Sequence, residues 1–366
     1  MNRRWICNDV WMDIFPSFDH AQLGLKLALL SPRFNALVDK HFNGKSELTI
    51  WRQIIIRRKD SDSTATAPEL AVFIDAVNSV PFPLPDLPLP SKIRFKRLQI
   101  DYIDDSVIAF LRLNHQIFDK RGTDLHLWFP CSYTTHGQRI WDIFVREIWP
   151  IFSANIHHLR FSHGGHLDNL LRRTSPTILT DLNQLNSIDS FGRLPEAIGA
   201  DFDGQNATIS VGQALSKWLH SPRKDGQPKR LRCKNYNEQA NFDWVNNFKE
   251  HFLRANAISS VSYQIHFYVR VPSMQMVPFE LVIEWTKEKL TLAKAKENEW
   301  DNRWIMNRFK IIGETAAVNW KDGNWDNNCN YVFIWLVSVN DCIGPLTPPP
   351  AEEDRDKASQ MIRPQI

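Results

Sequence analysis

The sequence predicts an α/β protein whose body is built on a parallel sheet, and three observations support this prediction. Short apolar runs typical of strands begin about every thirty residues through the middle of the chain. Amphipathic helical patterns lie between them, and strand, helix, strand at this interval indicates right-handed crossovers and a parallel sheet. A short helical segment precedes this array, and a segment of alternating residues follows it.

Composition narrows the class of protein. The chain has 366 residues, which is enough for a large domain and a small one, and a formal net charge of only +3. So small a charge indicates neither a nucleic acid nor a membrane surface as partner. No apolar run approaches the roughly 20 residues of a membrane span, and no signal peptide is visible. We expect a cytoplasmic or nuclear protein.

The cysteines predict free thiols. They are odd in number and widely spread, and none forms a CxxC pair: Cys7, Cys131, Cys233, Cys329 and Cys342. Reduced intracellular thiols explain this better than a disulfide framework or a zinc site. We expect neither a metal nor any other cofactor.

Residues 1–45 predict a small helical module. Its first helix begins near Asp9 and stops at Pro16, and Ser31 followed by Pro32 is a strong start signal for the third. Apolar residues recur at helical spacing in all three: Val10, Trp11, Ile14, Phe15, Leu23, Leu27, Leu30, Phe34, Leu37 and Val38. So short a segment is too small to form a stable core alone and too apolar to be fully solvated, which predicts a partner on one face.

This segment resembles an F-box, the short helical module that docks onto the Skp adaptor of SCF ubiquitin ligases. Ile6-Cys7 corresponds to the opening Leu-Pro of the family, Ile14-Phe15 to its Ile-Phe pair, and Leu23 to its central Leu. The later Val-Cys-x-x-Trp stretch corresponds to Leu30, Ser31 and Phe34. The similarity covers about a tenth of the chain.

The resemblance implies a set of adaptor-binding residues. They are Ile6, Val10, Ile14, Phe15, Leu23, Leu27, Leu30, Arg33 and Phe34. The Skp adaptor would in turn link the chain to a cullin.

Residues 46–91 predict a helix and a connector. Glu69 to Asn78 fits a short helix, and the five prolines between residues 80 and 91 predict an extended stretch. A packed spacer is favoured there over an SH3-type ligand.

Residues 92–275 predict the repeating body. The expected strands are Arg97–Ile100, Asp124–Phe129, Ile156–Phe161, Ser187–Phe191, Arg230–Lys234 and Val261–Val269. The expected helices are Asp104–Phe118, Gln138–Phe152, His166–Leu182, Val211–His220 and Phe242–Ala255. An irregular leucine-rich-repeat-like α/β array fits this order best, and an ordinary open α/β sheet is the alternative.

Residues 276–345 predict a different, antiparallel segment rich in Trp. Phe279–Trp285 and Lys289–Lys294 alternate like the strands of a hairpin, and Trp304–Ile312 fits a third strand. Residues 346–366 are proline-rich and charged and predict a disordered tail.

The body also carries stretches similar to those of an expanded F-box family of plant-parasitic nematodes. They are PLPDLPLPSKIRF, IDYIDDSVIAFL, SFGRLPE, ALSKWLHSPRKDGQPKRLRC and PFELVIEWTKEKLTL. The resemblance implies a substrate-receptor body without a catalytic domain.

Motifs of catalysis and metal binding are missing from the sequence: GxSxG, HExxH, CxxC and GxGxxG do not occur. His157, His158, His163 and His166 cluster without a carboxylate or Cys at ligand spacing, so they predict strand ends and loops. The basic residues between Lys92 and Arg97 predict an exposed strand face in preference to a nucleic-acid patch.

We therefore expect a non-catalytic substrate-recognition subunit of an SCF-type, cullin-RING ubiquitin ligase in the ubiquitin-conjugation pathway. Its N-terminal module would bind the Skp adaptor and its α/β body a protein substrate. A protein-binding scaffold outside any ligase is one alternative. An enzyme in the α/β body is another, and it predicts a deep pocket with convergent polar groups.

Overall fold

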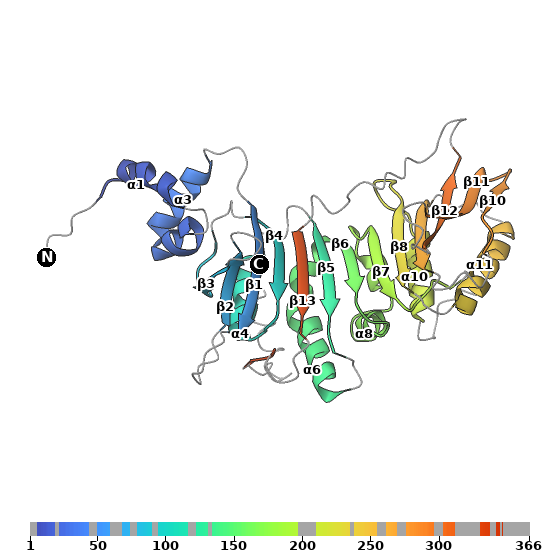
Figure 1. Ribbon diagram of the computed structural model, residues 1–366, viewed down its shortest axis with the longest axis horizontal. Helices are drawn as coiled ribbons and strands as arrows, with labels where there is room; N and C mark the ends of the chain where they lie inside the picture. The colour runs from blue at the N-terminus through green and yellow to red at the C-terminus, as the bar shows by residue number, and fades with distance from the viewer. Residues whose placement is uncertain are drawn as a thin grey trace, which may run out of the picture.

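The protein is seen here in a computed structural model that describes residues 6–18, 22–43, 50–58, 68–73, 79–89, 94–115, 122–130, 134–196, 210–234, 238–254, 261–268, 276–295, 303–311, 330–336, 342–344 and 346. These residues form a mixed α/β protein organised around one long twisted sheet (Figure 1). A small helical module lies at one end of it, beside the first strands.

The strands of the sheet stand in the order β10-β11-β12-β9-β8-β7-β6-β5-β13-β4-β1-β2-β3. Every neighbouring pair from β9 across to β1 is parallel. The outer pairs at both ends are antiparallel. The predicted parallel sheet is therefore confirmed for the middle of the molecule.

The parallel part of the sheet contains six strands that follow predicted runs and two, β1 and β13, that the sequence analysis did not predict as strands. All of them together are β1 (Ile50–Arg58), β4 (Arg94–Ile100), β5 (Thr123–Trp128), β6 (Ile156–Phe161), β7 (Ser187–Phe191), β8 (Lys229–Lys234), β9 (Tyr263–Tyr268) and β13 (Asn330–Trp335). Alternate residues of these strands, such as Leu125, Leu159, Ile188 and Leu231, are fully buried. These apolar positions face the helices and form the core.

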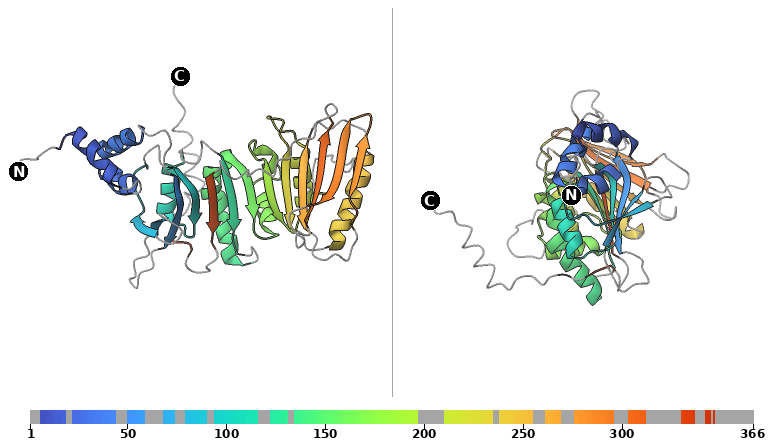
Figure 2. Two further views of the ribbon diagram at one scale, coloured as in Figure 1. Left: turned by 45° about the horizontal axis from the view of Figure 1, so that its top comes forward. Right: turned by 90° about the vertical axis from the view of Figure 1, so that its left-hand side faces the viewer.

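The helices between the strands cover one face of the sheet. They are α4 (Asp105–Leu113), α6 (Thr135–Ile143), η4 (Phe144–Ile148), α7 (Trp149–Phe152), η5 (Ser153–Asn155), α8 (His166–Arg173), α9 (Ile178–Asp181), α10 (Val211–His220) and α11 (Glu238–Leu253). The right-hand view of Figure 2 shows the teal and green helices gathered on one side of the strands. Trp141 of α6 packs 4.9 Å from Phe129, and Trp244 of α11 packs 5.5 Å from Phe267.

Local sequence explains where these helices begin. The Asp104 carboxylate accepts a hydrogen bond from the Val107 amide at 2.9 Å and caps α4. Ser210 and Gln213 exchange side chain–backbone hydrogen bonds at the start of α10, which is a complete capping box.

The helix predicted at Glu69–Asn78 is wrong. Residues Pro68–Phe73 form strand β2, which pairs antiparallel with β1 and with β3 (Ser79–Pro83). Leu70 and Ala71 are buried in this pairing, and Arg57 forms a 2.9 Å ion pair with Glu69 across it. Pairing with the neighbouring strands β1 and β3 thus overrides the local helical preference. The prolines of β3 fit because it is an edge strand.

The C-terminal segment is divided differently from the prediction. β10 (Phe279–Ile283), β11 (Glu288–Lys294) and β12 (Arg303–Lys310) confirm the antiparallel strands. However, β13 does not belong to them, because it inserts between β4 and β5, parallel to both. Val332 and Ile334 are fully buried there, so β13 completes the core of the body. Trp320, Trp325 and the predicted tail beyond residue 346 lie outside the described residues.

The N-terminal module consists of α1 (Asn8–Ile14), η1 (Phe15–Ser17), η2 (Leu23–Leu27), η3 (Ala28–Leu30) and α3 (Pro32–Asn43). The predicted start of the third helix is confirmed, since the Ser31 hydroxyl accepts a hydrogen bond from the Phe34 amide at 3.3 Å. The module contacts the sheet where the Lys26 ammonium lies 5.3 Å from the centre of the Phe82 ring.

Candidate functional site

The N-terminal module has a small aromatic core. Phe15 and Leu23 are fully buried in it. Trp11 packs edge-on against Phe34 at 4.9 Å, and Phe15 packs edge-on against His41 at 5.6 Å. Two of the predicted adaptor-binding residues, Phe15 and Leu23, therefore hold the module together.

Other predicted adaptor-binding residues remain on the surface. Ile6 is 45% exposed, Val10 44% and Leu30 65%. Ile14, Leu27 and Phe34 are half-buried. The predicted set thus divides into residues that support the module and residues that a partner could cover.

Arg33 joins the first helix of the module to the last. Its guanidinium donates to the Ile6 carbonyl at 2.8 Å and to the Asn8 side-chain oxygen at 2.8 and 3.2 Å. It therefore positions the segment that carries Ile6 and Val10. Trp11 was absent from the predicted adaptor-binding set, although it was among the apolar residues at helical spacing in the first helix.

The sheet face opposite the helices of the body, here called the outer face, carries polar and aromatic side chains. One row runs across neighbouring strands by register: Gln99, Phe333, His126, Arg160, Asp189, Arg232 and His266. Strands in a sheet with one buried face expose every second residue on the other, which explains the alternation.

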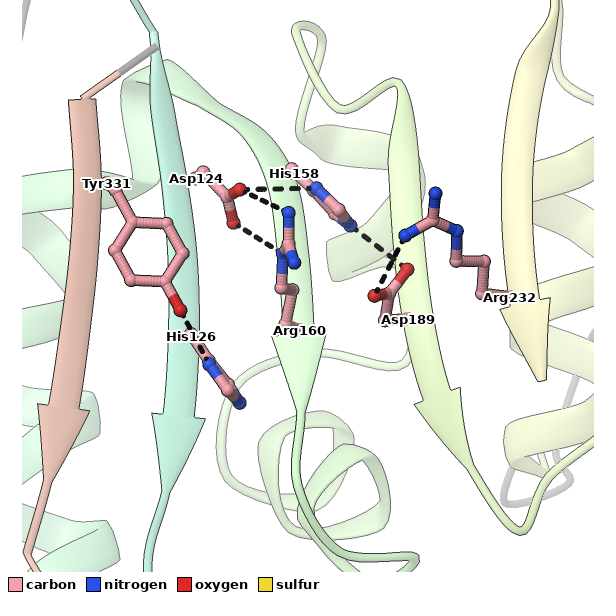
Figure 3. Close-up of polar contacts among 7 residues, drawn as sticks. All are labelled: Asp124, His126, His158, Arg160, Asp189, Arg232 and Tyr331. Atoms are coloured by element: carbon pink, nitrogen blue, oxygen red, sulfur yellow. Dashed lines mark hydrogen bonds and ion pairs between the residues drawn. The ribbon is translucent and has the colours of Figure 1, made fainter. Parts of the chain in front are cut away.

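Five of the residues on the outer face form a continuous charged chain, shown in Figure 3: Asp124, Arg160, His158, Asp189 and Arg232. Asp124 accepts two hydrogen bonds from Arg160, at 2.8 and 3.0 Å, and lies 3.4 Å from His158 Nδ1. His158 Nε2 lies 3.1 Å from Asp189, which lies 3.9 Å from Arg232. Asp124 and His158 are largely withdrawn from water.

Contacts within the charged chain shift the pKa values of its residues. Burial alone would raise the pKa of Asp189, but His158 and the arginines Arg232 and Arg160 outweigh it and lower that pKa to about 2. Burial likewise opposes the charged form of His158, yet its contacts with Asp124 and Asp189 raise its pKa above the ordinary value. The contacts along the charged chain therefore favour the ionised forms of both Asp189 and His158.

His126 behaves in the opposite way. Its ring nitrogens lie 2.9 Å from the Tyr331 hydroxyl and 2.8 Å from the Ser162 hydroxyl. Burial and the neighbouring Arg160 lower its pKa to about 4. A neutral His126 therefore links β5 to β13 through hydrogen bonds.

Beyond the charged chain the outer face is aromatic. Trp128 of β5 and Trp335 of β13 stack with ring centres 5.4 Å apart and an angle of 14° between the rings. Trp128 is 36% exposed and Trp335 42%. Phe333 packs 5.4 Å from Trp335, and the Arg97 guanidinium lies 5.1 Å over the Tyr331 ring. Such amphipathic aromatic surface is common at protein interfaces.

The fold separates His158 from His166, whereas the rings of His163 and His166 lie 5.0 Å apart. His158 points to the outer face, whereas His166 is buried on the helical side, 3.2 Å from the Phe129 carbonyl. In the part of the chain that the structure describes, no group of three His, Cys, Asp or Glu residues is placed to hold a metal ion.

A hollow of about 630 Å³ opens between α8, α10 and α11. Its rim carries an exposed ion pair of 3.2 Å between Arg193 and Asp168. Ser210, which caps α10, also donates to Glu196. The polar side chains named here are thus engaged in ion pairing and helix capping.

The sequence predictions missed the charged chain of the outer face. A signal was present, since Asp124, His126 and Trp128 alternate with apolar residues in one strand, as Arg230, Arg232 and Lys234 do in another. The missing information was the order of the strands, which brings these alternating residues together.

Comparison with protein-family models, with curated proteins and with solved structures gave no match. Among the described helices, none combines the length and the apolar character needed to cross a bilayer.

Proposed function

We propose that this protein is a non-catalytic substrate-recognition subunit of an SCF-type ubiquitin ligase, acting in the cytoplasm or nucleus. The N-terminal module serves as an F-box and docks onto the Skp adaptor, and through it the chain reaches a cullin. The body, a leucine-rich-repeat-like α/β array, holds a protein substrate. The ligase then works by raising the effective concentration of substrate lysines near a ubiquitin-charged enzyme.

The observation that supports this proposal most is the exposure of Ile6, Val10 and Leu30 on a module with very little core of its own. Burying such aliphatic side chains against a partner contributes about 1.5 to 3 kcal/mol for each one. The pattern of F-box residues accounts for their presence at these positions, whereas solubility alone does not.

Direct titration of the purified full chain with a recombinant Skp adaptor tests the proposal. The double variant Val10→Asp with Leu30→Asp places charges at two exposed positions, so we expect it to lose adaptor binding while remaining folded. The sheet body offers a matched control in Val282→Asp with Leu253→Asp, which changes the same residue types at 37% and 54% exposure. This control should bind the adaptor normally.

Two outcomes would reject the adaptor assignment. One is a wild-type chain that does not bind the adaptor. The other is equal adaptor affinity for the wild type and the Val10→Asp, Leu30→Asp variant, with circular dichroism showing that both are folded.

A scaffold outside any ligase is the second candidate, and one contact favours it. Phe34, at the position of the family's Trp, packs on Trp11 instead of standing free on the surface. Such a scaffold would capture a protein partner through its body without binding the adaptor.

A further inference from the structure

The two ends of the sheet are protected to different degrees. Figure 1 shows β3 and β10 as the outermost strands, β3 near the N-terminal module and β10 at the far end. β3 contains Pro81 and Pro83, which carry no N–H and so leave that strand short of hydrogen-bond donors. β10 contains no proline, and among the strands that the structure describes it pairs with β11 alone. β10 is therefore an open edge that can accept a further strand.

The backbone groups of β10 that point away from the sheet belong to Glu280 and Val282. The Ile283 carbonyl accepts a hydrogen bond from the Lys287 amide at 2.9 Å, so it points toward the turn that leads into β11. Backbone groups of successive residues in a strand point to opposite sides, which directs those of Glu280 and Val282 outward. Each of these two residues therefore offers one donor and one acceptor to a further strand.

Exposed apolar side chains gather along the same edge. Val277 is 69% exposed, Trp285 57% and Val282 37%. Phe279 and Leu281 are half-buried and pack against the core. A strand added to β10 would cover these side chains and pair the outward backbone groups at the same time.

The charges of this edge are paired within the hairpin that β10 forms with β11. Glu280 forms an ion pair with Lys289, and Glu284 forms one of 2.9 Å with Lys287. A highly charged partner would therefore gain little here, and the chemistry of the edge favours an apolar strand.

The edge is complementary to itself. When two copies of β10 pair antiparallel about a twofold axis at Leu281, Trp285 stands opposite Val277 of the second copy, and Glu280 opposite Val282. The outward donors and acceptors of Glu280 and Val282 then face one another. No two like charges stand opposite each other in this register, and the most exposed apolar residues of the edge cover each other.

We propose that this protein forms a symmetric dimer in which β10 pairs with β10 of a second copy and the two sheets join into one. Each N-terminal module lies near the opposite end of its own sheet, so the two modules stand at the far ends of the dimer (Figure 1). This inference goes beyond the proposed function and does not depend on it. Together the two would give a receptor that presents two adaptor-binding modules at once.

Sedimentation velocity of the purified full chain, in the absence of the adaptor, tests the proposal. One chain has a mass of 42.7 kDa. We expect the mass of two chains at high protein concentration, because association follows mass action.

A pair of charge variants locates the interface. Val277→Lys with Trp285→Lys sets lysines opposite lysines in the proposed register, so we expect dimer affinity to fall by about tenfold or more. Val277→Glu with Trp285→Glu should have the same effect through opposed carboxylates. An equimolar mixture of the two variants should form a dimer, because each lysine then faces a glutamate.

A matched control carries lysines elsewhere on the surface. Leu113→Lys with Trp335→Lys replaces an aliphatic residue and a tryptophan at 39% and 42% exposure, away from β10. Its dimer affinity should stay within about twofold of the wild type. Circular dichroism verifies that all variants are folded.

The proposal is overturned if the wild-type chain sediments as a monomer at every concentration, which would leave the edge to a strand of another protein. It is also overturned if the lysine and glutamate variants each dimerise as the wild type does, or if their mixture stays monomeric. Because the adaptor is absent, these results leave adaptor docking untouched, and a failure of adaptor docking leaves this measurement unchanged.

Discussion

The N-terminal module and the outer face of the sheet both present side chains at the surface, but with opposite chemistry. The module exposes aliphatic side chains, Ile6, Val10 and Leu30, over a core of a few aromatic rings. The outer face carries paired charges and exposed, stacked tryptophans over a core that runs the length of the sheet. The comparison suggests that the module needs a partner to cover its apolar side chains, whereas the charged chain of the outer face is paired within the protein.

The largest expected effect lies in the core of the body. Trp141 is fully buried against Phe129, whereas Trp128 on the outer face is 36% exposed. Trp141→Ala should lower the free energy of unfolding by about 3 to 5 kcal/mol, because it removes a large buried side chain and leaves a cavity. Trp128→Ala should cost far less. Urea denaturation measures both, and equal losses would mean that the outer face is part of the core.

The second largest loss of stability is expected from changes in the charged chain. Asp124→Asn leaves Arg160 and His158 without a carboxylate they both contact, and losing one partner of a largely buried ion pair costs about 3 kcal/mol. Asp225→Asn breaks the pair of Asp225 with Arg223, in which Asp225 is 51% exposed, and serves as the control. A similar loss of stability in the two variants would show that the charged chain is solvated.

Acid should reduce the contribution of the charged chain to the stability of the protein. The pKa of Asp189 falls from 3.8 to about 2 on folding, so its contribution to stability is complete above pH 3.8 and is lost as the pH falls through 2. This contribution is on the order of 2 kcal/mol, and Asp189→Asn should remove that part of the acid dependence. Urea denaturation at pH 6, 4 and 2 measures it. If the free energy of unfolding of Asp189→Asn falls at low pH as much as that of the wild type, the lowered pKa of Asp189 is contradicted.

The smallest expected effect concerns the module. Arg33→Ala loses the hydrogen bonds to Ile6 and Asn8, so we expect about 1 kcal/mol less stability for the first helix. Hydrogen exchange at the amides of α1 measures this locally, and exchange in the sheet should stay unchanged. Faster exchange throughout the chain would show that the module and the sheet unfold as one unit.

Much of the fold could be predicted because its signals are local. The alternation in β6 and β7 and the capping residues of α10 lie within a few positions of each other, and these elements were found at their observed bounds. β2 was predicted as a helix from its local pattern, although its strand partners β1 and β3 are its neighbours in sequence. The position of β13 could not be predicted, because its partners β4 and β5 lie far away in sequence. The outer face depends on the same long-range order.

The N-terminal module and the β10 edge are two binding regions at opposite ends of the sheet, and the mass of the complex with the Skp adaptor tests both most directly. Light scattering after size-exclusion chromatography measures this mass. We predict that the wild-type chain forms a complex of two chains and two adaptors. The Val10→Asp, Leu30→Asp variant should remain a dimer without the adaptor. The Val277→Lys, Trp285→Lys variant should bind the adaptor as a single chain. Dissociation of the wild-type dimer by saturating adaptor would contradict the account, because it would mean that the two partners compete for one surface.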